Sequence, residues 1–124
     1  MNIDTINIIA LAYLGDSIYE LYIREKLINN GITKVENLQN KAKNYVSAKG
    51  QAKILKSLLE NNILTEEELN IVKRGRNNKR TNHPKNTDII TYKLSTGFEA
   101  LIGYLYLTNN LERIKEILNY IEVK

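Results

Sequence analysis

The sequence predicts an all-α protein of about seven helices, and three observations lead to that fold class. Strand signals are weak, because the 124 residues include a single proline and show no sustained alternation of apolar and polar side chains. Apolar residues recur instead at the three- and four-residue spacing of helices. Residues that cap helix N-termini precede several of these segments.

The predicted helices follow one another along the chain. The segment from Asp4 to about Ile28 is apolar on several faces, which predicts two helices that meet near Leu14 and Gly15, with Gly31 as the end of the second. Residues 76–86 are mostly polar and predict an exposed loop. The remaining helix starts are predicted by a capping box of Thr33 with Glu36, by Ser47, by a second box of Thr65 with Glu68, by Asp88 and by Asn110.

Length and composition limit the class of protein. The 14.3 kDa chain fits one domain spanning residues 1–124, with a single core. It has no cysteine, which excludes disulfides, thiolate catalysis and cysteine-based zinc sites. The stretch from Met1 to Tyr13 carries no Lys or Arg, unlike a secretory signal, and no apolar run is long enough to span a bilayer. We therefore expect a cytoplasmic protein without a membrane span.

The positive charge is concentrated in one segment. The formal net charge of +4 arises from 18 basic and 14 acidic residues. Residues 69–87 hold six of the basic residues and none of the acidic ones, so the remainder of the chain is net negative. A localised basic segment is typical of a polyanion-binding patch. The six candidate polyanion-binding residues are Lys73, Arg74, Arg76, Lys79, Arg80 and Lys85.

Two acidic residues, Asp16 and Glu99, interrupt apolar helical segments that contain no Lys or Arg near them. An ionised carboxylate in such surroundings is costly unless it is paired. A distant cation, backbone donors or a shared divalent ion could each compensate it, and oxygen ligands favour Mg²⁺ or Mn²⁺ over zinc. A structural role for both acids therefore stays open beside a metal site. Glu20 shares a helical face with Asp16 and could support the metal, although its spacing from Arg24 also fits a surface ion pair.

The order of several motifs resembles the ribonuclease III family over nearly the whole chain. Residues 10–20, ALAYLGDSIYE, resemble the family signature, and residues 95–105, STGFEALIGYL, resemble its second acidic motif. The stretches YVSAK at 45–49, KRGRN at 73–77 and PKNTD at 84–88 resemble the short branch called Mini-ribonuclease III.

This resemblance implies an all-α endonuclease domain that forms a symmetric homodimer and cleaves double-stranded RNA with Mg²⁺, for which Mn²⁺ could substitute. Asp16 falls on the catalytic aspartate and Glu99 on the second-motif glutamate. The additional acids of ribonuclease III enzymes proper are replaced by Ile9, Ala12 and Thr96, which leaves the number of metal ions open. The short branch is associated with maturation of the large-subunit ribosomal RNA precursor, and a ribosomal protein could present that RNA.

The expected reaction is phosphodiester hydrolysis, with Asp16 and Glu99 as holders of the metal ion and the basic segment as the source of RNA affinity. Because the sequence leaves no room for a separate double-stranded-RNA-binding domain, we expect the catalytic domain itself to grip RNA. One alternative is a non-catalytic helical RNA-binding module of a ribonucleoprotein, which would use the same basic segment. Another is a protein-interaction domain, which would not explain the charge concentration.

Overall fold

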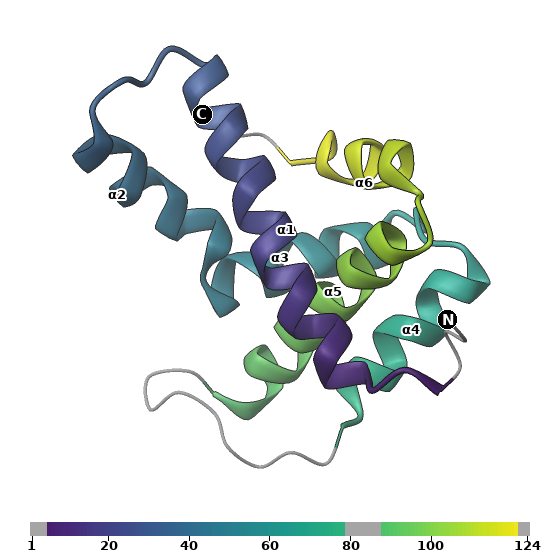
Figure 1. The fold of residues 1–124 in the computed structure, drawn as a ribbon. Helices are drawn as coiled ribbons and strands as arrows, with labels where there is room; N and C mark the ends of the chain where they lie inside the picture. Colours follow the sequence, from purple (N-terminus) through teal and green to yellow (C-terminus); the bar gives the residue numbers. More distant parts are fainter. Residues whose placement is uncertain (1–4, 79–87, 122–124) are drawn as a thin grey trace.

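The computed structural model describes residues 5–78 and 88–121, which form six helices (Figure 1). No strand occurs in these residues, which confirms the all-α prediction. None of the described helices is both long enough and apolar enough to cross a membrane. The helices are α1 (Ile8–Asn29), α2 (Val35–Val46), α3 (Ala48–Glu60), α4 (Glu66–Arg76), α5 (Ile89–Leu107) and α6 (Leu111–Leu118).

The N-terminal segment forms one continuous helix, so the prediction of two helices was wrong. Helix α1 begins after Asn7, whose side chain accepts a hydrogen bond from the Ile9 N–H at 2.8 Å, and passes through Gly15 without a break. A Cβ at Gly15 would collide with the backbone of Glu99 and Gly103 in α5. The glycine that suggested a helix boundary therefore allows two helices to cross at close range, and the described residues contain six helices instead of about seven.

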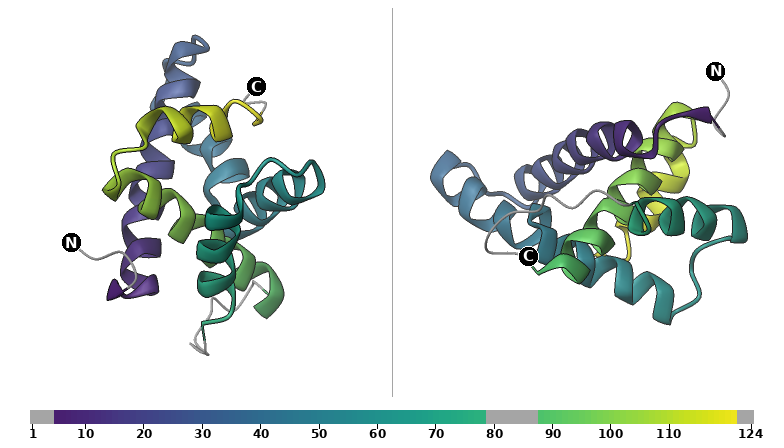
Figure 2. Two further views of the ribbon diagram at one scale, coloured as in Figure 1. Left: turned by 90° about the vertical axis from the view of Figure 1, so that its right-hand side faces the viewer. Right: turned by 90° about the horizontal axis from the view of Figure 1, so that it is seen from below.

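Helices α1 and α5 cross at the centre of the molecule, and the other helices pack around this crossing (Figure 1, Figure 2). Helix α5 contacts α1, α3, α4 and α6, and α2 packs on α1 and α3. At the crossing the fully buried Tyr19 and Phe98 rings meet edge to face, with centroids 5.1 Å apart. The core thus fixes the relative placement of α1 and α5.

Three of the predicted N-terminal caps are confirmed. The Ser47 hydroxyl accepts a hydrogen bond from the backbone N–H three residues later at 3.1 Å, and Asp88 does the same at 2.8 Å. Thr65 and Glu68 form the full reciprocal capping box at the start of α4. These signals are local, and they fixed the starts of α3, α4 and α5 correctly.

Two other predicted caps are wrong. Helix α2 begins at Val35 after Lys34, with no side-chain cap, so Thr33 and Glu36 do not form a capping box. The chain leaves α1 through Gly31 at a φ of 92°, with backbone hydrogen bonds that close the helix end, and it is not yet helical at Thr33. Asn110 precedes α6 but its side-chain amide donates to a threonine hydroxyl in the turn after α5 instead of capping α6.

Candidate active site

The helix crossing places Asp16 and Glu99 on one cavity of about 470 Å³. Its walls are the N-terminal half of α1, the first turns of α5 and the end of α4. Both carboxylates are half-buried, and Asp16 directly follows the glycine whose backbone lies against Glu99. The close approach of α1 and α5 therefore brings two acids from distant parts of the sequence together. The cavity lining also includes Tyr13, Gly75, Asn78, Lys93 and Thr96.

The two acids share an electrostatic environment that disfavours two negative charges. Burial, together with the hydrogen-bonded and negatively charged Asp16 carboxylate, raises the pKa of Glu99 to about 9, and a hydrogen bond from Gln51 opposes the rise. None of the ion pairs among the described residues includes Asp16 or Glu99. The metal-free site therefore holds a proton at neutral pH, and it would gain from a cation.

Gln51 is a site residue that sequence reasoning missed. Its side chain is only 1 % exposed, and its Nε2 donates to the Val46 carbonyl at 3.1 Å and to Glu99 Oε2 at 3.4 Å. The available signal was a polar residue in line with Leu55 and Leu58, at the spacing of the buried face of α3. That pattern marks an unusual buried amide, but only the packing of α5 on α3 shows what it contacts.

The donor set of the cavity fits a hard cation that keeps part of its water shell. The described residues contain no group of three or more His, Cys, Asp or Glu that could form a complete cage. Two carboxylates suffice for Mg²⁺, which usually retains several waters and takes one or two carboxylates from the protein. Among the described residues that line the cavity there is no His or Cys, the ligands typical of zinc sites.

Glu20, the third acid suggested by the sequence, is not brought to this cavity. Its carboxylate forms an ion pair with Arg24 at 2.6 Å, one helical turn further along α1. The two residues line a different surface depression between α1 and α2. This placement matches the helix-surface ion pair that its spacing also allowed.

The predicted basic segment reaches the edge of the cavity through the C-terminal turns of α4. Lys73 is exposed, the Arg74 guanidinium donates to the Ile6 carbonyl at 3.2 Å, and Arg76 Nε donates to Asn77 Oδ1 at 3.4 Å. Arg74 thus ties the end of α4 to the residues before α1, whereas Lys73 extends into solvent. The other predicted RNA-binding residues, Lys79, Arg80 and Lys85, lie outside the described residues.

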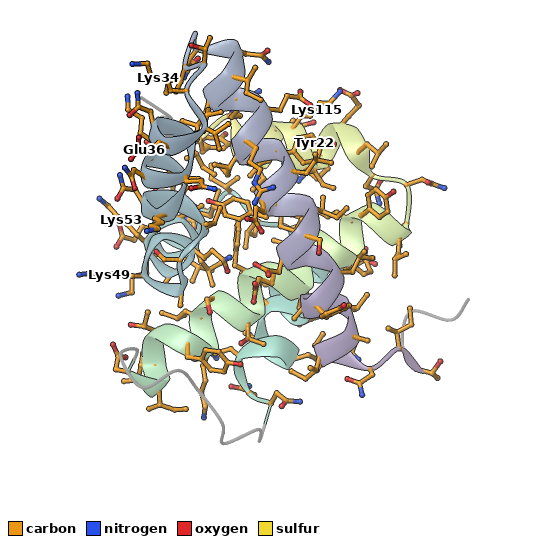
Figure 3. The ribbon with its side chains drawn as sticks, turned by 60° about the vertical axis from the view of Figure 1, so that its left-hand side comes forward. Tyr22, Lys34, Glu36, Lys49, Lys53 and Lys115 are labelled. Carbon is orange, nitrogen blue, oxygen red and sulfur yellow. The ribbon has the colours of Figure 1, made fainter. Side chains whose placement is uncertain are left out.

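A second group of basic residues lies on α2 and α3, so the charge is not confined to one segment. Residues 34–56 contain six lysines and one acid, Glu36. All six are exposed, and none takes part in an ion pair within the described chain, although Arg24, Arg113 and Lys115 elsewhere do. Figure 3 shows Lys34, Lys49 and Lys53 along one side of the molecule. The net charge of all residues outside 69–87 is negative, and that sum concealed this group. Its members are Lys34, Lys41, Lys43, Lys49, Lys53 and Lys56.

One face of α1 exposes large apolar side chains beside the cavity. Tyr13, Leu21 and Ile28 are 82 %, 59 % and 56 % exposed. Their spacing places them on a common helix face, on which Ser17 lies between Tyr13 and Leu21 and Ala10 precedes Tyr13. An apolar stripe of this kind is typical of a surface that another protein covers.

The chain is similar to a set of ribonucleases and to a solved structure. The Ribonuclease III domain model matches residues 9–110. A Mini-ribonuclease 3 from Streptococcus pneumoniae is 48% identical over 120 residues, which cover 97% of this chain and 94% of that protein. A Mini-ribonuclease 3 from Enterococcus faecalis is 50% identical over 115 residues, covering 93% and 87% of the two chains. A crystal structure of a protein from Fusobacterium nucleatum matches with a TM-score of 0.85 and 37% identity, covering 95% of this chain and 94% of that one.

These matches confirm the resemblance seen in the sequence motifs. They extend over both acidic motifs and over the basic end of α4, all of which lie within residues 9–110. The fold agrees as well, because the similar crystal structure covers almost the whole chain. The chain therefore belongs to the ribonuclease III family, in its Mini-ribonuclease III branch, and is an endoribonuclease of the ribonuclease III type.

Proposed function

We propose that this endoribonuclease hydrolyses double-stranded RNA at the cavity formed by Asp16 and Glu99, with a divalent cation held by these two carboxylates. The observation that carries the proposal is the meeting of two half-buried acids from α1 and α5 in one cavity, where no described cation pairs with them. Enzymes of the family act on double-stranded RNA and generally depend on a divalent metal. Two carboxylates in one cavity can supply the protein ligands that such a metal ion requires.

Mg²⁺ is the proposed ion, with Mn²⁺ as a substitute, because both prefer oxygen ligands. When bound, it supplies Lewis acidity toward the scissile phosphate, activates the attacking water and stabilises the leaving 3′ oxygen. The protein holds Asp16 and Glu99 on two packed helices, so little reorganisation is needed at the moment of binding. Lys93 lies six residues before Glu99 on α5 and lines the same cavity, where its ammonium group can attract the phosphate.

RNA is held, in this proposal, by the basic residues around the cavity. A-form RNA is recognised mainly through phosphates and 2′-hydroxyls, so lysine and arginine side chains can bind it with little sequence preference. The end of α4 borders the cavity at Gly75 and carries Lys73, Arg74 and Arg76. Lys79, Arg80 and Lys85 complete the predicted group.

We further propose that two copies of the chain pair through the exposed face of α1. Pairing would bury Tyr13 and Leu21 and would place two acid pairs in one particle, one for each RNA strand. Replacement of Leu21 by Glu should convert the dimer to a monomer in light scattering, because a charge would enter the apolar contact. A wild-type protein that is monomeric at micromolar concentration would contradict this part of the proposal.

The proposed substrate is the precursor of the large-subunit ribosomal RNA, with a ribosomal protein as a partner that could present it. This finer assignment is supported by the motifs of the Mini-ribonuclease III branch rather than by the geometry of the cavity. It places the enzyme in the cytoplasm, with the precursor RNA. Comparison of cleavage rates on that precursor, with and without ribosomal proteins, and on a generic duplex tests it.

The experiment that tests the central proposal is cleavage of a long RNA duplex in Mg²⁺ or in EDTA. We expect the wild type to cut only with the metal, and Asp16→Asn and Glu99→Gln to bind the duplex without cutting it. Glu112→Gln, which changes an exposed acid in the first turn of α6 away from the cavity, is the matched control and should cut normally. Binding without cleavage by the wild type in every divalent metal tried would contradict the proposal.

A further inference from the structure

Gln51 occupies a position where an apolar side chain would be expected. It lies on the buried face of α3 in line with Leu55 and Leu58, and it is 1 % exposed. Amide side chains are seldom buried unless their polar atoms find partners. The contacts of this amide therefore indicate why it is there.

The Gln51 amide connects the backbone of α2 to the proposed metal ligand. Its Nε2 donates one hydrogen bond to the carbonyl of Val46, the last residue of α2, at 3.1 Å. It donates another to Glu99 Oε2 at 3.4 Å. Both N–H groups are thus used, and one of the two carboxylate oxygens of Glu99 is held from the side of α3.

The turn that carries this amide is itself held firmly. A Cβ at Gly50 would lie 2.9 Å from the Tyr45 carbonyl oxygen, so the end of α2 and the start of α3 are in backbone contact. The hydroxyl of Tyr19 on α1 donates to the same carbonyl at 2.9 Å. Tyr19 lies three residues after Asp16 on α1. Helix α1 therefore carries Asp16 and also fixes the junction of α2 and α3, from which Gln51 reaches Glu99.

The other half of the amide has no partner. Gln51 Oε1 is fully buried and finds no hydrogen-bond donor among the described residues. An unpaired buried acceptor lowers the stability of the fold, whereas Leu or Met would fill the same stripe without that penalty. A buried acceptor that the fold leaves unpaired is expected at a functional site.

We infer that Gln51 is a positioning residue of the active site, whose amide N–H orients the Glu99 carboxylate for binding the divalent cation. The inference rests on the proposed function, because it takes Glu99 as a metal ligand. Groups that hydrogen-bond to ligating carboxylates fix their orientation and raise the affinity for the ion. The unpaired Oε1 remains an acceptor for a donor that enters the site with the ion or the RNA.

The test compares Gln51→Met, which keeps the length of the side chain but removes the N–H, with Leu55→Met, one turn further on the same buried face. Mn²⁺ is titrated into the RNA-free proteins by calorimetry, and thermal unfolding is recorded in EDTA. We expect Gln51→Met to weaken Mn²⁺ binding by about 10- to 100-fold, with a Tm in EDTA no lower than that of the wild type. Leu55→Met should bind Mn²⁺ like the wild type.

A double-mutant cycle shows whether the effect passes through Glu99. In a Glu99→Gln background, Gln51→Met should cause no further loss of Mn²⁺ affinity. If Gln51→Met does not fold, Gln51→Asn replaces it, since its shortened amide cannot reach both partners and the same loss is expected. Unchanged Mn²⁺ affinity in these variants, or an equal loss in the Glu99→Gln background, would overturn the inference while leaving metal-dependent cleavage by the wild type intact. Absence of Mn²⁺ binding by the wild type would instead overturn the proposed metal site.

Discussion

Binding of a divalent cation to the metal-free enzyme should release about one proton per chain at pH 7, because Glu99 must ionise to become a ligand. Burial and the neighbouring Asp16 carboxylate raise the pKa of Glu99 to about 9, so the group is almost fully protonated at pH 7. The metal-free state therefore holds a proton that the metal-bound state lacks. The metal competes with that proton, and its affinity should rise with pH.

The loss of metal affinity that this competition causes follows from the difference between the pKa of Glu99 and the pH of the experiment. At pH 7, two units below the pKa of about 9, ionising the group costs about 3 kcal/mol, which weakens the apparent metal affinity about 100-fold. The affinity should increase about tenfold for each pH unit between pH 6 and 8 and should level off near pH 9. A site whose ligands are already ionised would show almost no change over this range.

Calorimetric titration with Mn²⁺ at several pH values, in buffers with different heats of ionisation, measures the affinity and the released protons together. The Glu99→Gln variant is the control, and it should bind weakly without the proton release that belongs to this carboxyl. Tight binding by the wild type with no proton release and no pH dependence would refute the reasoning, because Glu99 would then be ionised without metal or would not be a ligand.

The same pKa has a consequence for the stability of the metal-free protein. A carboxyl with a raised pKa in the folded state contributes stability that is complete below its usual pKa of 4.5 and is lost as the pH rises through about 9. Denaturation in EDTA should therefore show a decline between these values that saturating metal removes. This measurement checks the direction of the shift independently of the calorimetry.

Two further predictions concern charged residues outside the cavity. Arg113→Met should destabilise the protein by about 3–5 kcal/mol in urea unfolding, because Glu68 is 4 % exposed and would lose its ionic partner. Burial tends to raise the pKa of Glu68, but hydrogen bonds from Arg113 and from the N-cap residue of α4 hold it below the usual value of 4.5. The stability that the ionised Glu68 contributes should therefore be lost as the pH falls below about 4.5 and through the lowered pKa. Replacement of Lys49, Lys53 and Lys56 by Gln should weaken binding of the RNA duplex without changing thermal unfolding. The slope of the logarithm of the binding constant against the logarithm of the salt concentration should become less steep by roughly 2–3. An unchanged salt slope would show that the outer face of α3 does not contact RNA.

Local signals in the sequence predicted much of the fold. The caps at Ser47, Thr65 and Asp88 depend on hydrogen bonds within a few residues, and each fixed the start of a helix correctly. Gly15 was misread because its role is a close contact with Glu99 and Gly103, far away in the sequence. A glycine at a helix crossing and a glycine at a helix end look alike in a single sequence.

Only those residues of the candidate site that carry a charge within an apolar segment could be predicted from the sequence. Asp16 and Glu99 attracted attention because they are acids in apolar helices, and the structure places both on one cavity. Gln51 carries no charge and lies in a helix with several lysines, so no pattern within α3 linked it to Glu99. The lysines of α2 and α3 were missed for another reason, since their charge was averaged with acids that lie on other helices.

The backbone contact at Gly15 links the fold to the chemistry of the site. Any larger residue at this position would separate α1 from α5, since its Cβ would overlap the backbone of Glu99. Separation of the helices would move Asp16 away from Glu99, weaken the repulsion that helps to keep a proton on Glu99, and widen the space that an ion must bridge. The proximity that makes two negative charges unfavourable without metal is thus the same proximity that allows both carboxylates to hold one cation. A structural glycine in the core therefore sets both the proton affinity and the proposed metal affinity of the site.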